Sequence, residues 1–461
     1  MRPRENDYKR YAAIAAAVVT ALGLAGVLAG VLHAAPSFLH IRQNLSYTDY
    51  TSAYPELAIS ADRNYLAATW VEGYDENSGS KGHVYLRIAS ESGGWSPPIE
   101  VYHGSASACA YDRAAVAISG TTAHIAYVVW ADCTNRQNTR VYYTTCSLTG
   151  GTCGSNELVL STTTQKIFWV DIAVDEDENP HLVFARYQQE ESDLHGKILY
   201  KGHTGSGWGS DETVYAGTGT DNHTPAIAWS DDCAHVVWEN ETQGDILYRR
   251  RCAGTWAPSP SMMYNSTPDY PPHSPDVAAA GGRVFVVWDS LAQPATPYNP
   301  ATRYLLYKRS NDSGVNFSPV AYALDVGTDH TGGIPDPYTE HVVGAAEETA
   351  YLKYLQPSIA LNEDGWPAVV WHTGGVTGTY YTYAISGTDT SVDWVESKTL
   401  LFGGQAGAPS VAFGGWVTDT IPLLHVAYMG TSGDSWDIYY DSNEAAFIDL
   451  PTIYLPLVMK R

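Results

Sequence analysis

Charged residues are scarce in this chain, and basic ones most of all. Asp, Glu, Lys and Arg make up 16% of the 461 residues, and 26 basic against 50 acidic residues give a net charge of −24. Phosphate backbones repel so acidic a chain, which argues against nucleic-acid binding. Phe and Met number only 8 and 5, against 33 Tyr and 14 Trp. With 41 Gly and 25 Pro, this composition is typical of a β-rich globular protein and argues against a coiled coil, a helical bundle or a disordered chain.

Familiar catalytic motifs are also missing. The sequence has no Gly-rich phosphate loop, no Gly-x-Ser-x-Gly turn and no His-Glu-x-x-His pair. The acidic run Asp175–Asn179 lacks the oxygen spacing of a calcium loop and is interpreted as a hairpin turn. The sequence therefore predicts neither a cofactor nor a metal site.

The N-terminus has the pattern of an export signal. Four basic residues lie within positions 1–10, and Tyr11–His33 follows as 23 residues without a formal charge. This run is long enough to span a bilayer, and Ala34 and Ala35 offer a cleavage site. Residues 1–35 are therefore expected to be either a cleaved signal peptide or a retained membrane anchor. In both cases the remaining chain is expected to be extracytoplasmic, either secreted or anchored, and it meets the membrane only through this segment if the segment is uncleaved.

A repeat of roughly 50 residues occupies most of the chain. Seven short segments carry a small residue among β-branched ones, at Ala58, Ala117, Ala173, Ala228, Ala278, Ala360 and Ala412. A second segment follows each and ends at Trp70, Trp130, Phe184, Trp238, Trp288, Trp371 and Tyr428. A third segment and a weaker fourth complete most units. Four short strands per repeat predict an all-β fold, a seven-bladed β-propeller of four-stranded antiparallel blades.

The repeat also predicts the domain organisation. The propeller is expected over residues 36–447, with blades starting near 54, 113, 169, 224, 274, 356 and 408. An insertion, 325–354, separates the fifth and sixth blades, and 448–461 form a C-terminal tail. The last blade has three clear strands, so Asn44–Asp49 is expected to supply its outer strand and close the ring.

One turn carries a family motif. Residues Ser310, Asp312, Gly314 and Phe317 match the Asp-box pattern Ser-x-Asp-x-Gly-x-x-aromatic, between the third and fourth strands of the fifth unit. Over about residues 44–441 the chain thus resembles the sialidase-like, Asp-box (BNR-repeat) propeller superfamily. The resemblance implies the fold and a structural role for these four residues. The catalytic motifs of sialidases are not present. The Arg-Ile-Pro motif is absent, and the three arginines that bind the substrate carboxylate in that family cannot all be identified in the sequence.

Strand order places the candidate site at one end of the central channel. Loops before the first strands and after the second strands share this face. The polar residues expected there as ligand-binding candidates are Glu72, Asp112, Arg113, Asp132, Arg186, His223, His273 and His372. Glu239 and Asp289, on adjacent blades, are candidate catalytic carboxylates if they lie about 5–10 Å apart.

Six cysteines in an exported chain, none in a Cys-x-x-Cys motif, indicate disulfides. Strand order brings together Cys109 and Cys133, Cys146 and Cys153, and Cys233 and Cys252. The expected function is an exported propeller that binds or scaffolds glycans or extracellular proteins. The alternatives are a sialidase-like glycoside hydrolase with a divergent active site and a structural subunit of a membrane-attached assembly.

Overall fold

The computed structural model describes residues 43–46, 50–73, 82–90, 94–105, 107–133, 137–163, 165–188, 196–217, 220–266, 272–293, 302–322, 356–373, 378–387, 392–394, 399–402, 406–418, 421–432 and 435–442. All belong to the second of the chain's two compact units, Phe38–Arg461. The predicted segment 1–35, insertion 325–354 and tail 448–461 lie outside the described residues. Among the residues described, no helix has the length and apolar character needed to cross a bilayer.

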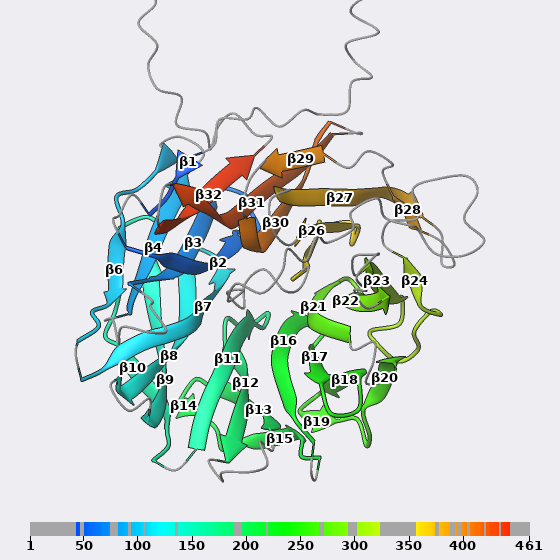
Figure 1. Ribbon diagram of the computed structural model, residues 1–461, viewed down its shortest axis with the longest axis horizontal. Helices are drawn as coiled ribbons and strands as arrows, with labels where there is room; N and C mark the ends of the chain where they lie inside the picture. Colours follow the sequence, from blue (N-terminus) through cyan, green and yellow to red (C-terminus); the bar gives the residue numbers. More distant parts are fainter. Residues whose placement is uncertain are drawn as a thin grey trace, which may run out of the picture. The chain divides into compact units, whose positions relative to one another are not determined.

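The described elements are β-strands arranged in seven antiparallel sheets, the blades of a propeller (Figure 1). Blade one contains β2 (Ser52–Ile59), β3 (Tyr65–Glu72), β4 (His83–Ser90), β5 (Gly94–Trp95) and β6 (Ile99–Tyr102). Blade two contains β7 (Cys109–Ser119), β8 (Thr122–Asp132), β9 (Gln137–Ser147) and β10 (Glu157–Ser161). Blade three contains β11 (Gln165–Val174), β12 (Pro180–Gln188), β13 (Gly196–Thr204), β14 (Gly207–Trp208) and β15 (Glu212–Tyr215).

The remaining blades repeat this plan. Blade four contains β16 (Asn222–Ser230), β17 (Cys233–Asn240), β18 (Asp245–Cys252), β19 (Thr255–Trp256) and β20 (Ser261–Asn265). Blade five contains β21 (Pro272–Ala280), β22 (Arg283–Gln293), β23 (Thr302–Ser310) and β24 (Ala321–Tyr322). Blade six contains β25 (Ser358–Leu361), β26 (Pro367–Thr373), β27 (Gly378–Gly387), β28 (Val392–Trp394) and β29 (Thr399–Phe402). Blade seven contains β30 (Ala406–Thr418), β31 (Ile421–Ser432), β32 (Ser435–Ser442) and β1 (Gln43–Asn44).

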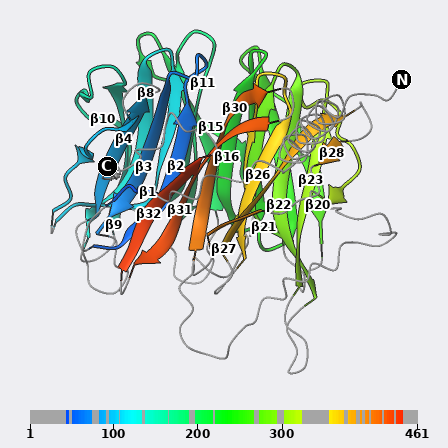
Figure 2. The same ribbon diagram turned by 90° about the horizontal axis from the view of Figure 1, so that it is seen from above.

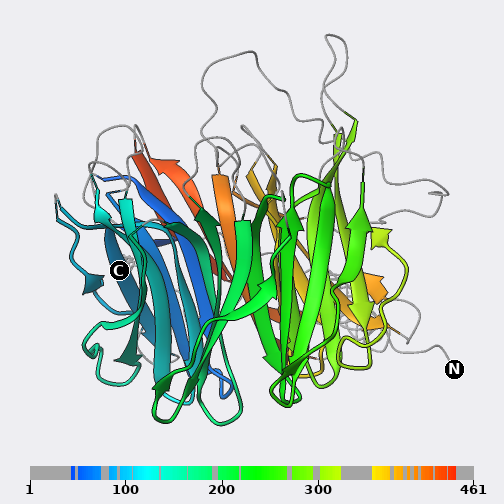
Figure 3. The same ribbon diagram turned by 90° about the horizontal axis from the view of Figure 1, so that it is seen from below.

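The blades form a closed ring, as the repeat predicted. The innermost strands contact one another in the order β2, β7, β11, β16, β21, β25, β30 and back to β2. Figures 2 and 3 show the strands running between two ends where the connecting loops gather. β1 pairs with β32, and the amide of Leu45 donates a 2.7 Å hydrogen bond to the carbonyl of Ile438. The N-terminal strand thus completes the last blade by pairing with the outer side of β32.

The core lies between the blades. The aromatic residues of the second strands are buried, and six of them pack in clusters shared by two neighbouring blades: Trp70, Trp130, Phe184, Trp238, Trp288 and Tyr428. Trp70, for example, packs with Ala427 and Tyr440 of blade seven, and Trp238 packs with Val183 of blade three. One blade alone would leave these rings in water, so burial of the large side chains joins the blades.

Blade two departs from the predicted alignment. Ala58 and Ala173 are each the third paired residue after the bulge of their innermost strand. In blade two this position is occupied by Val116, not by Ala117. By the same pairing, Val128 rather than Trp130 takes the place of the buried aromatic residue. β7 and β8 are longer than the strands of blade one, so Trp130 lies nearer the strand end and stacks on Tyr111 at 4.4 Å.

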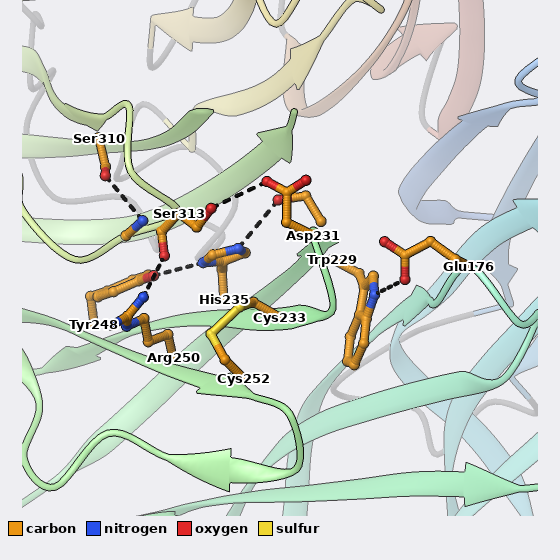
Figure 4. Close-up of a disulfide and its surroundings, with 12 residues drawn as sticks. Glu176, Trp229, Asp231, Cys233, His235, Tyr248, Arg250, Cys252, Ser310 and Ser313 are labelled. Atoms are coloured by element: carbon orange, nitrogen blue, oxygen red, sulfur yellow. Dashed lines mark hydrogen bonds between the residues drawn. A yellow bond between two sulfur atoms is a disulfide. The ribbon is translucent and has the colours of Figure 1, made fainter. Parts of the chain in front are cut away.

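Histidine–tyrosine pairs recur at the end of the ring opposite the inner-strand starts. In each pair, Nδ1 of a His on the second strand shares a hydrogen bond of 2.6–2.8 Å with the hydroxyl of a Tyr on the third strand. The pairs are His124–Tyr143, His181–Tyr200, His235–Tyr248 and His425–Tyr440. Figure 4 shows the pair of blade four beside the Cys233–Cys252 disulfide. Burial lowers the pKa of His124 and His235 to about 4 and that of His425 to about 3. These imidazoles are neutral packing groups.

The Asp-box closes the turn after β23. The Ser310 hydroxyl donates to Asp312 at 2.6 Å and accepts from the Gly314 amide at 3.0 Å, and Phe317 packs on Tyr248 at 4.8 Å. The structure also contains the three predicted disulfides, with Cα separations of 5.8 Å for Cys109–Cys133, 4.0 Å for Cys146–Cys153 and 4.2 Å for Cys233–Cys252.

Candidate functional site

The innermost strand of every blade begins with the same unusual backbone conformation. One residue takes a left-handed conformation with φ between 41° and 66°, at Tyr54, Asp112, Trp169, Thr224, Ser274, Gln356 and Ala408. Proline follows in five of the seven blades, as in Pro55 and Pro275. Strand pairing shifts at this point in six blades, which is a β-bulge. A bulge bends its strand and redirects the following side chains, here toward the axis of the ring.

These bulges surround a cavity at the mouth of the central channel. Its volume is about 100 Å³, and all seven blades contribute to its wall. Besides the seven left-handed residues, the lining includes Glu56, Arg113, Asp276 and Ser358. A cavity of this volume fits one small polar group rather than a whole sugar ring.

Side chains of the bulges hold neighbouring blades together. Asp171 Oδ2 accepts a 2.8 Å hydrogen bond from the Ile227 amide, and Asp276 Oδ2 accepts one of 2.9 Å from the Ile359 amide. The Ser410 hydroxyl likewise accepts a 2.9 Å bond from the amide of Leu57. Each bond joins one blade to the next, and Asp276 also lines the cavity.

Glu56 and Arg113 are the charged groups of the cavity without a direct partner. Within the described part of the chain neither side chain forms a hydrogen bond or a close ion pair. Both residues line the cavity and are partly exposed. Burial raises the pKa of Glu56 to about 8, while Arg113 lowers it in part. Burial by itself would lower the pKa of Arg113, but the charges of Glu56, Asp171, Asp112 and Asp276 raise it.

The cavity is acidic on balance. One guanidinium faces the carboxyl groups of Glu56, Asp112, Asp171 and Asp276. Burial raises the pKa of Asp276 to about 6 and also raises those of Asp112 and Asp171. Only part of this negative charge is present at neutral pH, because the carboxyl group of Glu56, with a pKa of about 8, remains largely protonated.

A second polar cluster adjoins the cavity between blades four and five. The buried carboxylate of Glu239 lies 2.6 Å from His273 Nδ1 and 3.6 Å from His223 Nε2. The Thr224 hydroxyl and the Ser274 amide also donate to it, each at 3.3 Å. Both Thr224 and Ser274 line the cavity. Glu239 therefore connects the two blades directly behind the cavity wall.

Glu239 and His223 form an ion pair within this cluster. Burial would lower the pKa of His223, but Glu239, Glu241 and Asp221 raise it to about 9. Burial would raise the pKa of Glu239, but the charge of His223 and the hydrogen bond from His273 lower it. Glu239 is thus ionised and His223 protonated at neutral pH. The Trp169 ring, a cavity residue, lies 5.2 Å from the His223 ring and joins the two groups.

Asp289, the second catalytic candidate, lies in blade five, and His372 lies in blade six. Asp289 pairs with His273 across β21 and β22 and is fully buried. His372, in β26 of blade six, is fully buried as well. Among the ligand-binding candidates, the structure brings Arg113 and Asp112 into the cavity and His223 and His273 beside it.

Three candidates lie elsewhere. Arg186 forms a 3.2 Å ion pair with Asp211, just before the outer strand β15. Glu72 is buried and accepts a 3.3 Å hydrogen bond from Trp70 Nε1, and Asp132 ends β8 opposite Gln137. None of Arg186, Glu72 and Asp132 lines the cavity.

The sequence pattern did not predict Glu56, Asp171 or Asp276 as residues near the site. The available signal was the position after the proline of each repeat, because Pro55-Glu56 and Pro275-Asp276 are sequence neighbours. In blade three Val170 replaces the proline, which concealed Asp171. The structure also assembles two groups with the donors of a metal site, although the sequence predicted none: Asp221, His223 and Glu241, and His83, Glu100 and His103.

Comparison with known proteins finds only distant likenesses in structure. No family model and no curated protein matches the sequence. The GH93 α-L-arabinofuranosidase of Fusarium graminearum superposes over 87% of this chain and 96% of its own, with a TM-score of 0.47 and 11% identity. The intramolecular trans-sialidase of Ruminococcus gnavus covers 88% and 97% (TM-score 0.45, 11% identity), and the NanB sialidase of Streptococcus pneumoniae covers 89% and 71% (TM-score 0.44, 11% identity). At this level no activity or residue role is carried over from them.

Proposed function

We propose that this protein is an exported, extracytoplasmic binding module that holds a glycan or a protein against the mouth of its channel. The supporting observation is the cavity itself, into which Glu56 and Arg113 project without partners in the described chain. Ligand pockets that enclose a small molecule are typically about 300–1,000 Å³, and this cavity is about 100 Å³. A large ligand lying on the face and inserting one polar group fits that size better.

The state of Glu239 supports binding over glycoside hydrolysis. A general acid needs a raised pKa, and a base or nucleophile needs access to the substrate. Glu239 has a lowered pKa, is 1% exposed and already accepts bonds from His273, Thr224 and Ser274. These contacts suit a structural anchor between blades four and five.

A different residue favours the hydrolase alternative. Glu56 has a pKa of about 8 and shares the cavity with Asp276, whose pKa is about 6 and whose two oxygens accept backbone hydrogen bonds. Two carboxyl groups with different proton affinities are the elements of acid–base chemistry. A divergent glycosidase would therefore use Glu56 rather than Glu239 as its acid.

Binding and turnover assays separate these functions. The full-length protein is tested on a glycan array and against proteins of its own extracytoplasmic compartment, beside Arg113→Gln and Glu56→Gln. The matched control is Arg63→Gln, because Arg63 pairs with the exposed Glu363 instead of lining the cavity. Binding lost in the cavity variants and kept in the control supports the proposal. Turnover of fluorogenic glycosides that disappears in Glu56→Gln would replace it by the hydrolase.

A further inference from the structure

A group of side chains with metal-binding chemistry lies in the outer part of blade one. His83 begins β4, Glu100 lies in β6, and His103 follows β6. The Nδ1 atoms of both histidines lie against the same carboxylate oxygen, Glu100 Oε1, at 2.9 Å and 2.7 Å. The three donor atoms are all within 4.8 Å of one another. None of these residues lines the channel cavity, so the group is separate from the site described above.

A β-bulge brings Glu100 to the histidines. β6 pairs with β4 as Val84 with Tyr102 and then Tyr85 with Glu100, so the register shifts by one residue. Cross-strand partners share a face of the sheet, as do residues two apart on one strand. Glu100 therefore lies on the face of Tyr85 and His83. Without the bulge it would pair with Leu86 and lie on the opposite face.

The bulge recurs in other blades, whereas the three donor residues occur together only in blade one among these blades. Blades three and four have the same shift between their third and fourth strands. Lys197 and Asp245 there occupy the place of His83, and Thr213 and Met262 that of Glu100. The three-donor group is thus a feature of this particular sequence and no consequence of the fold.

The donors are oriented by their neighbours and remain accessible. The His83 ring stacks on Tyr85 at 6.2 Å, Tyr85 stacks on Trp70 at 5.8 Å, and His103 meets His83 edge-on at 4.7 Å. The exposed side-chain fractions are 21% for His83, 39% for Glu100 and 73% for His103.

Two imidazole nitrogens and one carboxylate oxygen select a metal class. Ca²⁺ and Mg²⁺ prefer oxygen ligands alone, whereas Zn²⁺ and its transition-metal neighbours bind this mixed set. Zn²⁺ lies about 2.0–2.2 Å from such donors, so ligands in tetrahedral positions stand roughly 3.4 Å apart. The observed separations need to widen by about half an ångström, which rotation of the exposed Glu100 and His103 side chains would supply.

We propose that His83, Glu100 and His103 bind one Zn²⁺-class ion at the rim of blade one, with the remaining coordination open to water or to a donor of a bound ligand. All six cysteines of the chain are paired in disulfides, so no thiolate competes for the ion. The inference does not depend on the function proposed for the cavity.

Calorimetric titration of the full-length, tag-free protein with ZnCl₂ tests the proposal, and Co²⁺ absorption reports the ligand geometry. One ion should bind per chain, more tightly than Ca²⁺ in a parallel titration. Because even outer-shell partners are worth about 10–100-fold in metal affinity, Glu100→Ala and His103→Ala should weaken Zn²⁺ binding by more than ~100-fold. The matched control, His203→Ala on blade three, should bind as the wild type does.

Three results would overturn the proposal. They are no Zn²⁺ binding by the wild type at micromolar concentration, unchanged binding in both Glu100→Ala and His103→Ala, and loss of binding in His223→Ala instead. The last result would place the ion on the second donor group, which contains Asp221, His223 and Glu241. Both His103 and Glu100 are exposed, so circular dichroism and thermal unfolding should show that their variants fold normally.

Discussion

His273 at the start of β21 and Glu239 near the end of β17 form a 2.6 Å hydrogen bond that joins two blades of the ring. Both residues are buried, at 5% and 1% exposure. Glu239 also lies beside the protonated His223. The bond is thus part of a buried charge network that supports the wall of the channel cavity.

Removal of the Glu239 charge is expected to destabilise the ring. In Glu239→Gln the protonated His223 loses its buried counter-charge, so the free energy of unfolding should fall by about 3 kcal/mol. Urea denaturation measures this loss. The matched control is Glu241→Gln, because Glu241 also contacts His223 but its side chain is 52% exposed. Equal effects of the two substitutions would contradict the assignment of Glu239 as the anchor.

Glu56 is expected to make stability depend on pH. Its pKa rises from 4.5 to about 8 on folding, so the folded state binds its proton more tightly than the unfolded chain does. The wild type should therefore lose stability as pH rises from about 4.5 to about 8. Glu56→Gln has no such titration and should be more stable than the wild type above that range, by a few kcal/mol. Arg113 retains three other carboxyl groups nearby.

Thermal unfolding of both proteins at the two ends of that pH range measures the effect. The difference in melting temperature between Glu56→Gln and wild type should grow with pH. A constant difference would show that Glu56 titrates near its ordinary value.

The buried histidines are expected to make the folded protein less stable at acidic pH. Burial first, and the charge of Arg250 second, lower the pKa of His235 from 6.5 to about 4. The unfolded chain therefore takes up this proton first, and stability falls as pH drops from about 6.5 to about 4, by up to about 3 kcal/mol. His235→Gln should be less stable at neutral pH, because it loses the bond to Tyr248, but should lose less on acidification. Urea midpoints across this range test it, with His203→Gln as the matched control, which should keep the wild-type slope.

Gly314 of the Asp-box is expected to tolerate no side chain. Its φ is +74°, and an added Cβ would collide with the Tyr248 hydroxyl. Gly254 provides the matched control, because its φ is +77° and nothing lies within 4 Å of an added Cβ. Gly254→Ala should lose about 1–2 kcal/mol from the left-handed backbone alone. Gly314→Ala should lose more, since the collision adds to that strain, and equal melting temperatures would refute the packing role of the turn.

The ring closure and the disulfides were accessible from sequence because they depend on strand order alone. Once seven four-stranded units are recognised, antiparallel order places Cys233 and Cys252 at the same end of one blade and gives Asn44 an open edge to pair with. Blade two shows where this reasoning fails. Its longer strands move Trp130 away from the repeated position, and spacing in the sequence could not reveal that shift.

The amino-acid sequence by itself determined the seven repeats, their strand order, the closure of the ring and the face that carries the candidate site. It did so because local hydrophobic pattern and turn residues specify strands, and strands of one repeat pair with their chain neighbours. Only the tertiary structure decided which polar groups meet. Contacts such as Glu239 with His273, or Glu100 with His103 and His83, depend on bulges that turn a side chain to the other face of its strand. A shift of one residue in pairing leaves no mark in composition or periodicity, yet it moves a carboxylate from one side of the sheet to the other.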